Sequence, residues 1–193
     1  MKKKLSWVWI IIIIIVLLVI FFVSKYNKMV TMRNDANVAW SQVENQYQRR
    51  FDLTPQLVDS VKQILKQEGT EDVYVRLAEA RSNYAGASTV NQKVEAAESY
   101  DSALSRLLAV VENYPQLKAN ENIKDLQVSI EGTENRLAVE RGRFNDTVGA
   151  YNAYIIRFPN NLTANMFGFD KMETFEAQEG SDTAPEVGNM FDN

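Results

Sequence analysis

The sequence predicts an all-α protein in which an N-terminal transmembrane helix continues without a break into a long antiparallel up-down helical bundle. Three observations predict this class. One apolar run lies near the N-terminus, and apolar residues then recur at steps of three and four along most of the chain. Only four Pro and eight Gly occur, mostly where this periodic pattern breaks. Short connections between successive helices make neighbouring helices antiparallel.

The apolar run over residues 5–23 is long enough to cross a bilayer once. Every residue over 10–23 is Ile, Val, Leu or Phe. As a helix the run spans roughly 28 Å, close to the ~30 Å hydrocarbon thickness of a bilayer. We interpret it as an uncleaved anchor, because a signal peptide has a shorter apolar core and no small-residue cleavage motif follows the run. The expected headgroup-layer residues are Trp7, Trp9 and Tyr26.

Basic residues flank the run on both sides. Lys2, Lys3 and Lys4 precede it, and Lys25, Lys28 and Arg33 follow it. The tight N-terminal cluster favours a cytoplasmic N-terminus, which places the large domain outside the cytoplasm.

We divide the chain into five parts. They are a basic segment over 1–4, the transmembrane helix over 5–24, a helical bundle over 25–159, a short apolar segment over 160–176 near the membrane-proximal end, and an acidic disordered tail over 177–193. Within the bundle, the first helix is expected to end at Leu53, and Thr54-Pro55 to cap and begin the second. Gly69-Thr70 marks either a kink or a break. Asn120 is expected to cap a long last helix that ends at Phe158-Pro159.

Composition excludes several classes of function. The chain has no His and no Cys, so Ser–His and Cys–His pairs and the imidazole and thiolate ligands of most metal sites are impossible. We therefore expect no enzyme activity, no cofactor and no metal. With a net charge of −4, the chain lacks the basic surface that binding to phosphate backbones requires, so no nucleic-acid partner is expected.

Polar residues in the last helix have two interpretations. Glu131 and Glu134 lie three apart on one helix and could form a cation or acid–base site. Alternatively, arginines of the first helix pair with these carboxylates across the bundle and set the helix register, which is the interpretation we favour. The candidate arginines are Arg33, Arg49 and Arg50.

The apolar segment after the bundle has no obvious place in the helical pattern. Leaving its aromatic rings in water would be unfavourable and would mark an interaction site. Three arrangements remain open: packing on the domain's own base, insertion at the lipid headgroups, or contact with a neighbouring copy. The residues concerned are Leu162, Met166, Phe167, Phe169 and Phe175.

Many short motifs along the chain resemble those of the LemA family of bacterial membrane proteins. They include Met32-Arg33-Asn34, Ala39-Trp40-Ser41, Arg49-Arg50-Phe51-Asp52-Leu53-Thr54-Pro55, Glu112-Asn113-Tyr114-Pro115, Glu131-Gly132-Thr133-Glu134-Asn135-Arg136, Phe144-Asn145, Tyr151-Asn152, Phe158-Pro159 and Phe167-Gly168-Phe169. Gln67-Glu68 departs from the His-Glu often found in the family. The resemblance implies one span of the bacterial inner membrane followed by a helical bundle. It also points to membrane organisation, because magnetosome-associated relatives are tied to organelle formation.

Together these observations predict a non-enzymatic protein that binds the lipid bilayer and self-associates as a scaffold on one membrane face. Confinement to a plane raises the effective concentration of the domains and favours such contacts. The alternative is an adaptor that binds another membrane protein, such as a protease or a transporter. A more remote alternative is a hydrolase that depends on Glu131 and Glu134.

Overall fold

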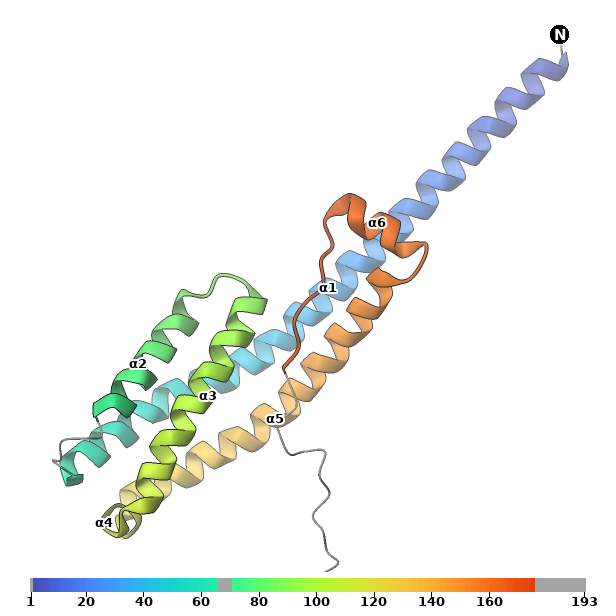
Figure 1. Ribbon diagram of the computed structural model, residues 1–193. Coiled ribbons are helices and arrows are strands. Elements are labelled where there is room, and N and C mark those ends of the chain that lie inside the picture. Colours follow the sequence, from blue (N-terminus) through green and yellow to red (C-terminus); the bar gives the residue numbers. More distant parts are fainter. Residues whose placement is uncertain (1, 66–70, 176–193) are drawn as a thin grey trace, which may run out of the picture.

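The computed structural model describes residues 2–65 and 71–175. These residues form helices and connections and include no strand, which confirms the all-α class (Figure 1). The helices are α1 (Lys2–Leu65), α2 (Glu71–Gly86), α3 (Val90–Asn113), α4 (Pro115–Lys118), α5 (Glu121–Ile156) and α6 (Asn160–Phe167).

The transmembrane segment and the first bundle helix are one helix. α1 contains 64 residues and is therefore about 96 Å long. Its N-terminal part extends beyond the rest of the molecule (Figure 1), and every side chain over 7–21 is exposed. It is the one helix among the described residues that is long and apolar enough to span a membrane. The predicted continuity of anchor and bundle is confirmed.

The predicted helix boundary at Thr54-Pro55 is wrong, because α1 continues through Pro55 to Leu65. Thr54 does not act as a cap: its hydroxyl donates to the Arg50 carbonyl oxygen (2.7 Å) and lies 2.6 Å from the Tyr100 hydroxyl. A proline inside a helix costs about 3 kcal/mol. Beyond Pro55, the buried apolar stripe of α1 continues through three residues: Leu57, Val61 and Leu65. Burial of each such side chain stabilises by about 1.5–3 kcal/mol, so together they outweigh the cost of the proline.

The helices run alternately away from and back toward the membrane-proximal end, as the up-down topology predicts. α1 and α5 lie antiparallel along most of the bundle, and the α2–α3 hairpin packs at the end far from the N-terminus (Figure 1). Gly69-Thr70, where a kink or a break was left open, and the acidic tail over 177–193 lie outside the described residues.

Local signals set several helix ends. Thr89 and Gln92 form a capping box at the start of α3. The Asn120 side chain accepts a hydrogen bond from the Ile123 amide (3.2 Å), so the predicted cap of the long last helix is confirmed. That helix, α5, ends at Ile156, two residues before the expected Phe158.

The buried residues form two apolar clusters. The larger fills the bundle and includes the rings of Trp40, Tyr47, Tyr100 and Phe144. The smaller lies at the membrane-proximal end, and its members are Met29, Tyr151, Ile155, Ala164 and Phe169.

Candidate functional site

An ion-pair network around the buried Arg50 joins three helices in the middle of the bundle. Arg50 of α1, only 3% exposed, donates to Asp101 of α3 at 2.6 Å and also pairs with Glu134 of α5. One guanidinium therefore links α1, α3 and α5 through charge-assisted hydrogen bonds, whose directionality favours a single helix register.

Asp101 is the centre of this network. It accepts a hydrogen bond from the Tyr47 hydroxyl (2.8 Å) and forms a second ion pair with Arg141. Burial raises the pKa of Tyr47 far above its ordinary value, and the negative charge of Asp101 acts in the same direction. The phenol thus stays neutral and remains a donor.

The structure brings together only some of the residues predicted to pair. Arg50 meets Glu134, whereas Arg33, Arg49 and Glu131 are exposed and form no ion pair within the described part of the chain. Sequence reasoning missed Asp101 and Arg141. A signal exists for Arg141, which lies between Leu137 and Phe144 on the apolar stripe of its helix at steps of four and three.

The described residues do not assemble a metal site. No group of three or more acidic, His or Cys residues among them could hold an ion. Glu134 is bound by Arg50, while Glu131 faces solvent, so the two carboxylates considered for acid–base chemistry have different surroundings.

At the membrane-proximal end, α6 lies beside α1 near the predicted interface residue Tyr26. The ring centroids of Phe167 and Phe169 are 5.0 Å and 5.5 Å from that of Tyr26. Gly168, between the two phenylalanines, has φ +71°, which a residue with a side chain rarely adopts. The glycine thus ends α6 and allows both rings to approach Tyr26. Trp7 and Trp9 are exposed at the other end of the apolar run.

The apolar segment divides into a buried part and an exposed part. Phe169 and Phe175 are buried, with the Phe175 ring 5.9 Å from those of both Trp40 and Phe144. In contrast Leu162, Met166 and Phe167 are about half exposed or more. Packing on the domain therefore accounts for only some of these side chains.

After α6, the chain runs antiparallel along α5 and is held there by two asparagines (Figure 1). Asn152 donates to the Met172 carbonyl oxygen (2.8 Å) and accepts from its amide (2.9 Å). Asn145 binds both backbone groups of Phe175 in the same way, at 2.9 and 3.0 Å. The two asparagines are seven residues apart in a helix, and their partners Met172 and Phe175 are three residues apart in a segment outside the helices. Seven helical residues and three extended residues each span about 10 Å, so both asparagines can reach their partners at once.

Sequence reasoning did not assign this role to the asparagines, although a signal was present. Phe144-Asn145 and Tyr151-Asn152 repeat an aromatic–Asn pair seven residues apart. Both aromatic rings are buried, which directs each following amide to the edge of the core. Tyr151 also donates to the Asp170 carbonyl oxygen (2.9 Å).

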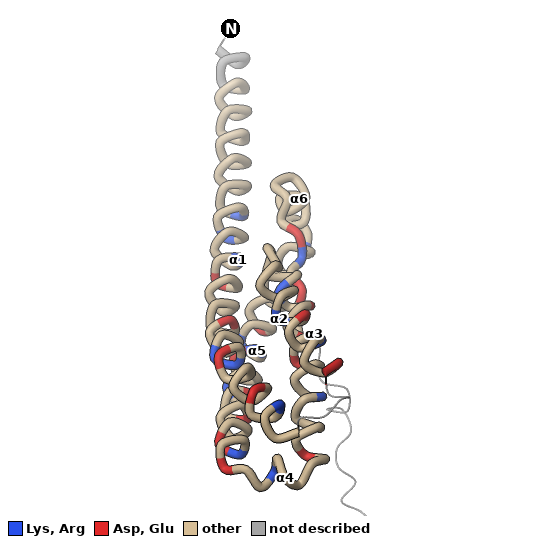
Figure 2. The backbone as a smooth tube through the Cα atoms, turned by 90° about the vertical axis from the view of Figure 1, so that its left-hand side faces the viewer, with Lys and Arg blue, Asp and Glu red and all other residues tan. Residues whose placement is uncertain are grey.

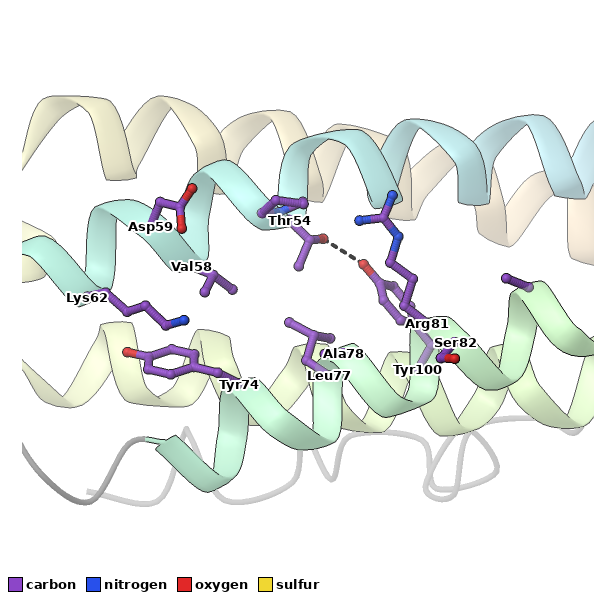
Figure 3. Close-up of a pocket in the computed structure, with 12 residues that line it drawn as sticks. Thr54, Val58, Asp59, Lys62, Tyr74, Leu77, Ala78, Arg81, Ser82 and Tyr100 are labelled. Carbon is purple, nitrogen blue, oxygen red and sulfur yellow. Dashed lines mark hydrogen bonds between the residues drawn. The ribbon is translucent and has the colours of Figure 1, made fainter.

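A separate groove of about 420 Å³ lies between α1 and α2 at the end far from the membrane (Figure 3). Thr54, Val58 and Leu77 form part of its wall. The Lys62 ammonium lies 4.8 Å from the centroid of the Tyr74 ring, whose buried hydroxyl has no hydrogen-bond partner among the described residues. The groove combines apolar walls with two basic residues, Lys62 and Arg81, and one acidic residue, Asp59.

The sequence model of the LemA family matches residues 39–188. This chain belongs to the LemA family. The match covers the ion-pair network and the two asparagines, Asn145 and Asn152, that bind the segment over 170–175, which we call the strap.

Three magnetosome proteins are similar to this LemA-family chain. Magnetosome protein MamQ of Magnetospirillum gryphiswaldense is 28% identical over 82% of this chain and 67% of its own length. MamQ 1 and MamQ 2 of Paramagnetospirillum magneticum are each 33% identical over 48% of this chain. The alignment spans 34% of the length of each of those two proteins. The family and these relatives agree with a membrane-associated helical protein.

Proposed function

We propose that this protein is a non-enzymatic membrane scaffold whose helical domains self-associate on one face of the bacterial inner membrane. The observation that carries the proposal is the continuity of α1, in which the apolar residues 5–23 and the bundle residues up to Leu65 form one helix. A domain joined to its anchor without a hinge has a restricted orientation, and confinement to a plane makes weak lateral contacts more populated.

The proposal places self-association in the helical domain rather than in the transmembrane segment. Helix pairing in bilayers favours Gly, Ala, Ser and Thr, and none of these occurs over residues 10–23. The ion pairs around Arg50 hold three helices of the domain in one register, which suits a repeated contact surface. The name of the MamQ relatives as magnetosome proteins also supports a role in membrane organisation.

We also propose that the N-terminus is cytoplasmic and that the domain lies on the opposite face. The cluster Lys2, Lys3 and Lys4 supports this orientation by the positive-inside rule. Labelling of an introduced cysteine with a membrane-impermeant maleimide in intact cells tests it. Val139→Cys on the exposed face of α5 should be labelled without lysis, and protection until lysis would reverse the orientation.

Self-association is tested by disulfide crosslinking in native membranes, which the absence of natural cysteines makes clean. Single Cys substitutions at exposed Val38, Val128 and Val139 sample α1 and α5. A subset should crosslink copies to one another, and light scattering of the purified protein should give a mass above the monomer. Uniform lack of crosslinks together with a strictly monomeric mass would overturn the scaffold.

The groove between α1 and α2 favours a second candidate function, an adaptor that binds another membrane protein such as a protease or a transporter. Ala78 is exposed on the groove wall, so Ala78→Trp should fill it (Figure 3). An adaptor predicts one stoichiometric foreign partner in membrane pull-downs that this variant loses. Recovery of mainly the protein itself, unchanged by the variant, would favour the scaffold.

A further inference from the structure

We infer that α6 and the turn before it form a second membrane contact, in which a phospholipid acyl chain occupies the groove between α6 and the transmembrane part of α1. The inference rests on the anchoring part of the proposed function and is independent of self-association. Three features of the described residues support it: the position of α6, the inverted arrangement of its side chains, and the chemistry of the groove.

The position of α6 is set by its contact with α1. Met166 and Phe167 line one side of an open groove of about 470 Å³, whose other side extends along α1 from Tyr26 to Ile15. The eleven helical steps from Ile15 to Tyr26 correspond to about 16 Å, which is roughly half of the hydrocarbon thickness. Because Tyr26 lies at the end of the apolar run, α6 is placed at the headgroup level and the groove extends into the acyl region.

α6 buries two polar side chains and exposes its largest apolar ones, which is unusual for a helix on a water-soluble domain. Two of its four polar residues, Asn160 and Thr163, are buried against the domain, whereas Asn161 is half-buried and Asn165 is exposed. The Asn160 amide donates to the Tyr154 carbonyl oxygen (3.0 Å). Its large apolar residues face outward: Leu162 is 52% exposed and Met166 is 61% exposed. An outward apolar face of this kind is stable in lipid and unfavourable in water.

Charge distribution agrees with this placement. No charged residue occurs over 158–169, and Figure 2 shows α6 without acidic or basic positions. Phe158, in the turn before α6, is 80% exposed. Basic residues border the charge-free surface at Lys25 and Lys28 on α1 and at Arg157 and Lys171 beside α6, where they can meet lipid phosphates; Asp170 is the acidic residue beside them.

The groove suits an acyl chain better than a second transmembrane helix. Its α1 wall is formed by bulky side chains: Ile15, Leu18, Val19, Phe22 and Val23. Close packing of a partner helix in a bilayer favours small residues. A flexible acyl chain adapts to an irregular wall of branched and aromatic side chains.

Depth-dependent quenching tests the inference on the full-length protein, reconstituted at one copy per nanodisc of phosphatidylcholine and phosphatidylglycerol. Met166→Cys is labelled with an environment-sensitive fluorophore, and spin-labelled lipids serve as quenchers. Val139→Cys is the matched control. Val139 is similarly exposed, but it lies about 25 Å along α5 from Ile156, the membrane-proximal end of that helix.

We expect the label at position 166 to shift its emission to the blue and to lose most of its intensity with acyl-chain quenchers, and the label at position 139 to do neither. A label at Phe158→Cys should also be quenched. Emission at position 166 that matches the control in correctly folded protein would overturn the inference. Quenching that appears only when discs hold several copies would instead assign the groove to a second copy. Because the main measurement uses single copies, its outcome does not depend on whether the scaffold proposal holds.

Discussion

The middle of the bundle and its membrane-proximal end are stabilised by different chemistry. In the middle, the buried Arg50 joins three helices through ion pairs with Asp101, which is partly buried, and Glu134, which is 41% exposed. At the membrane-proximal end, Tyr26, Phe167 and Phe169 pack ring against ring, and no charge occurs over 158–169. Charge pairs bridge the helices in the middle of the bundle, whereas large apolar groups are left exposed where the molecule meets its anchor.

This difference indicates what each region does. The ion pairs of the buried Arg50 restrict the arrangement of the helices, because their geometry is directional and a shift would leave its buried charge without a partner. Exposed apolar side chains restrict little and gain free energy only when a non-aqueous surface covers them. The middle of the bundle therefore holds the helices in one arrangement, and the membrane-proximal end supplies the inferred contact with lipid.

The largest expected effect comes from removing the centre of the network. Asp101→Ala leaves Arg50 and Arg141 without their shared carboxylate and should lower the free energy of unfolding by about 3–5 kcal/mol. Arg49→Ala, an exposed position adjacent to Arg50, is the control and should change it by less than about 0.5 kcal/mol. Thermal and urea unfolding followed by circular dichroism measures both, and equal effects would show that the network does not stabilise the bundle.

The next effect is a loss of stability in alkali. Burial raises the pKa of Tyr100 from 10.0 to about 12, so the folded state keeps its proton while the unfolded state releases it. The contribution of Tyr100 to the free energy of unfolding is therefore fully present below pH 10. It falls by up to about 3 kcal/mol as the pH rises toward 12. Tyr100→Phe removes this titration, so the difference between the two proteins in urea midpoint against pH isolates it. A constant difference from pH 9 to 12 would contradict the prediction.

A smaller effect is expected where the membrane-proximal end is joined to the bundle. Asn152→Leu leaves the backbone amide and carbonyl of Met172 without their partner, which should weaken the strap by about 1–3 kcal/mol. The strap contains Lys171, so trypsin should cleave there faster. Asn135→Leu, an exposed asparagine of the same helix, should leave the cleavage rate unchanged. Equal rates in both variants would mean that the amide pairing does not hold the strap.

The smallest effect distinguishes two glycines by sign. Gly168→Ala forces a side chain into the left-handed region and should destabilise the end of α6 by about 1–2 kcal/mol. Gly149→Ala in α5 meets no atom within 4 Å and should stabilise by about 0.4–1 kcal/mol. A melting temperature that does not fall in Gly168→Ala would show that a side chain does not strain the turn at Gly168.

Patterns along the chain were sufficient for the outline of the fold but insufficient for its long-range pairings. The apolar run, the cap at Asn120 and the three-four spacing of the apolar residues each depend on neighbours within a few residues, and all three were read correctly. The boundary at Thr54-Pro55 was read wrongly because local cap signals were outweighed by burial against helices distant in sequence.

The sequence by itself determined the helical class, the anchor and its length, because helix period and membrane thickness are properties of a continuous segment. Only the tertiary structure decided that Asp101 joins Arg50 to Arg141, that Asn145 and Asn152 hold the strap, and that α6 turns its apolar face outward. Each of these depends on which helices become neighbours. Packing of the whole domain determines which helices are neighbours, and no short segment of the sequence is sufficient to predict it.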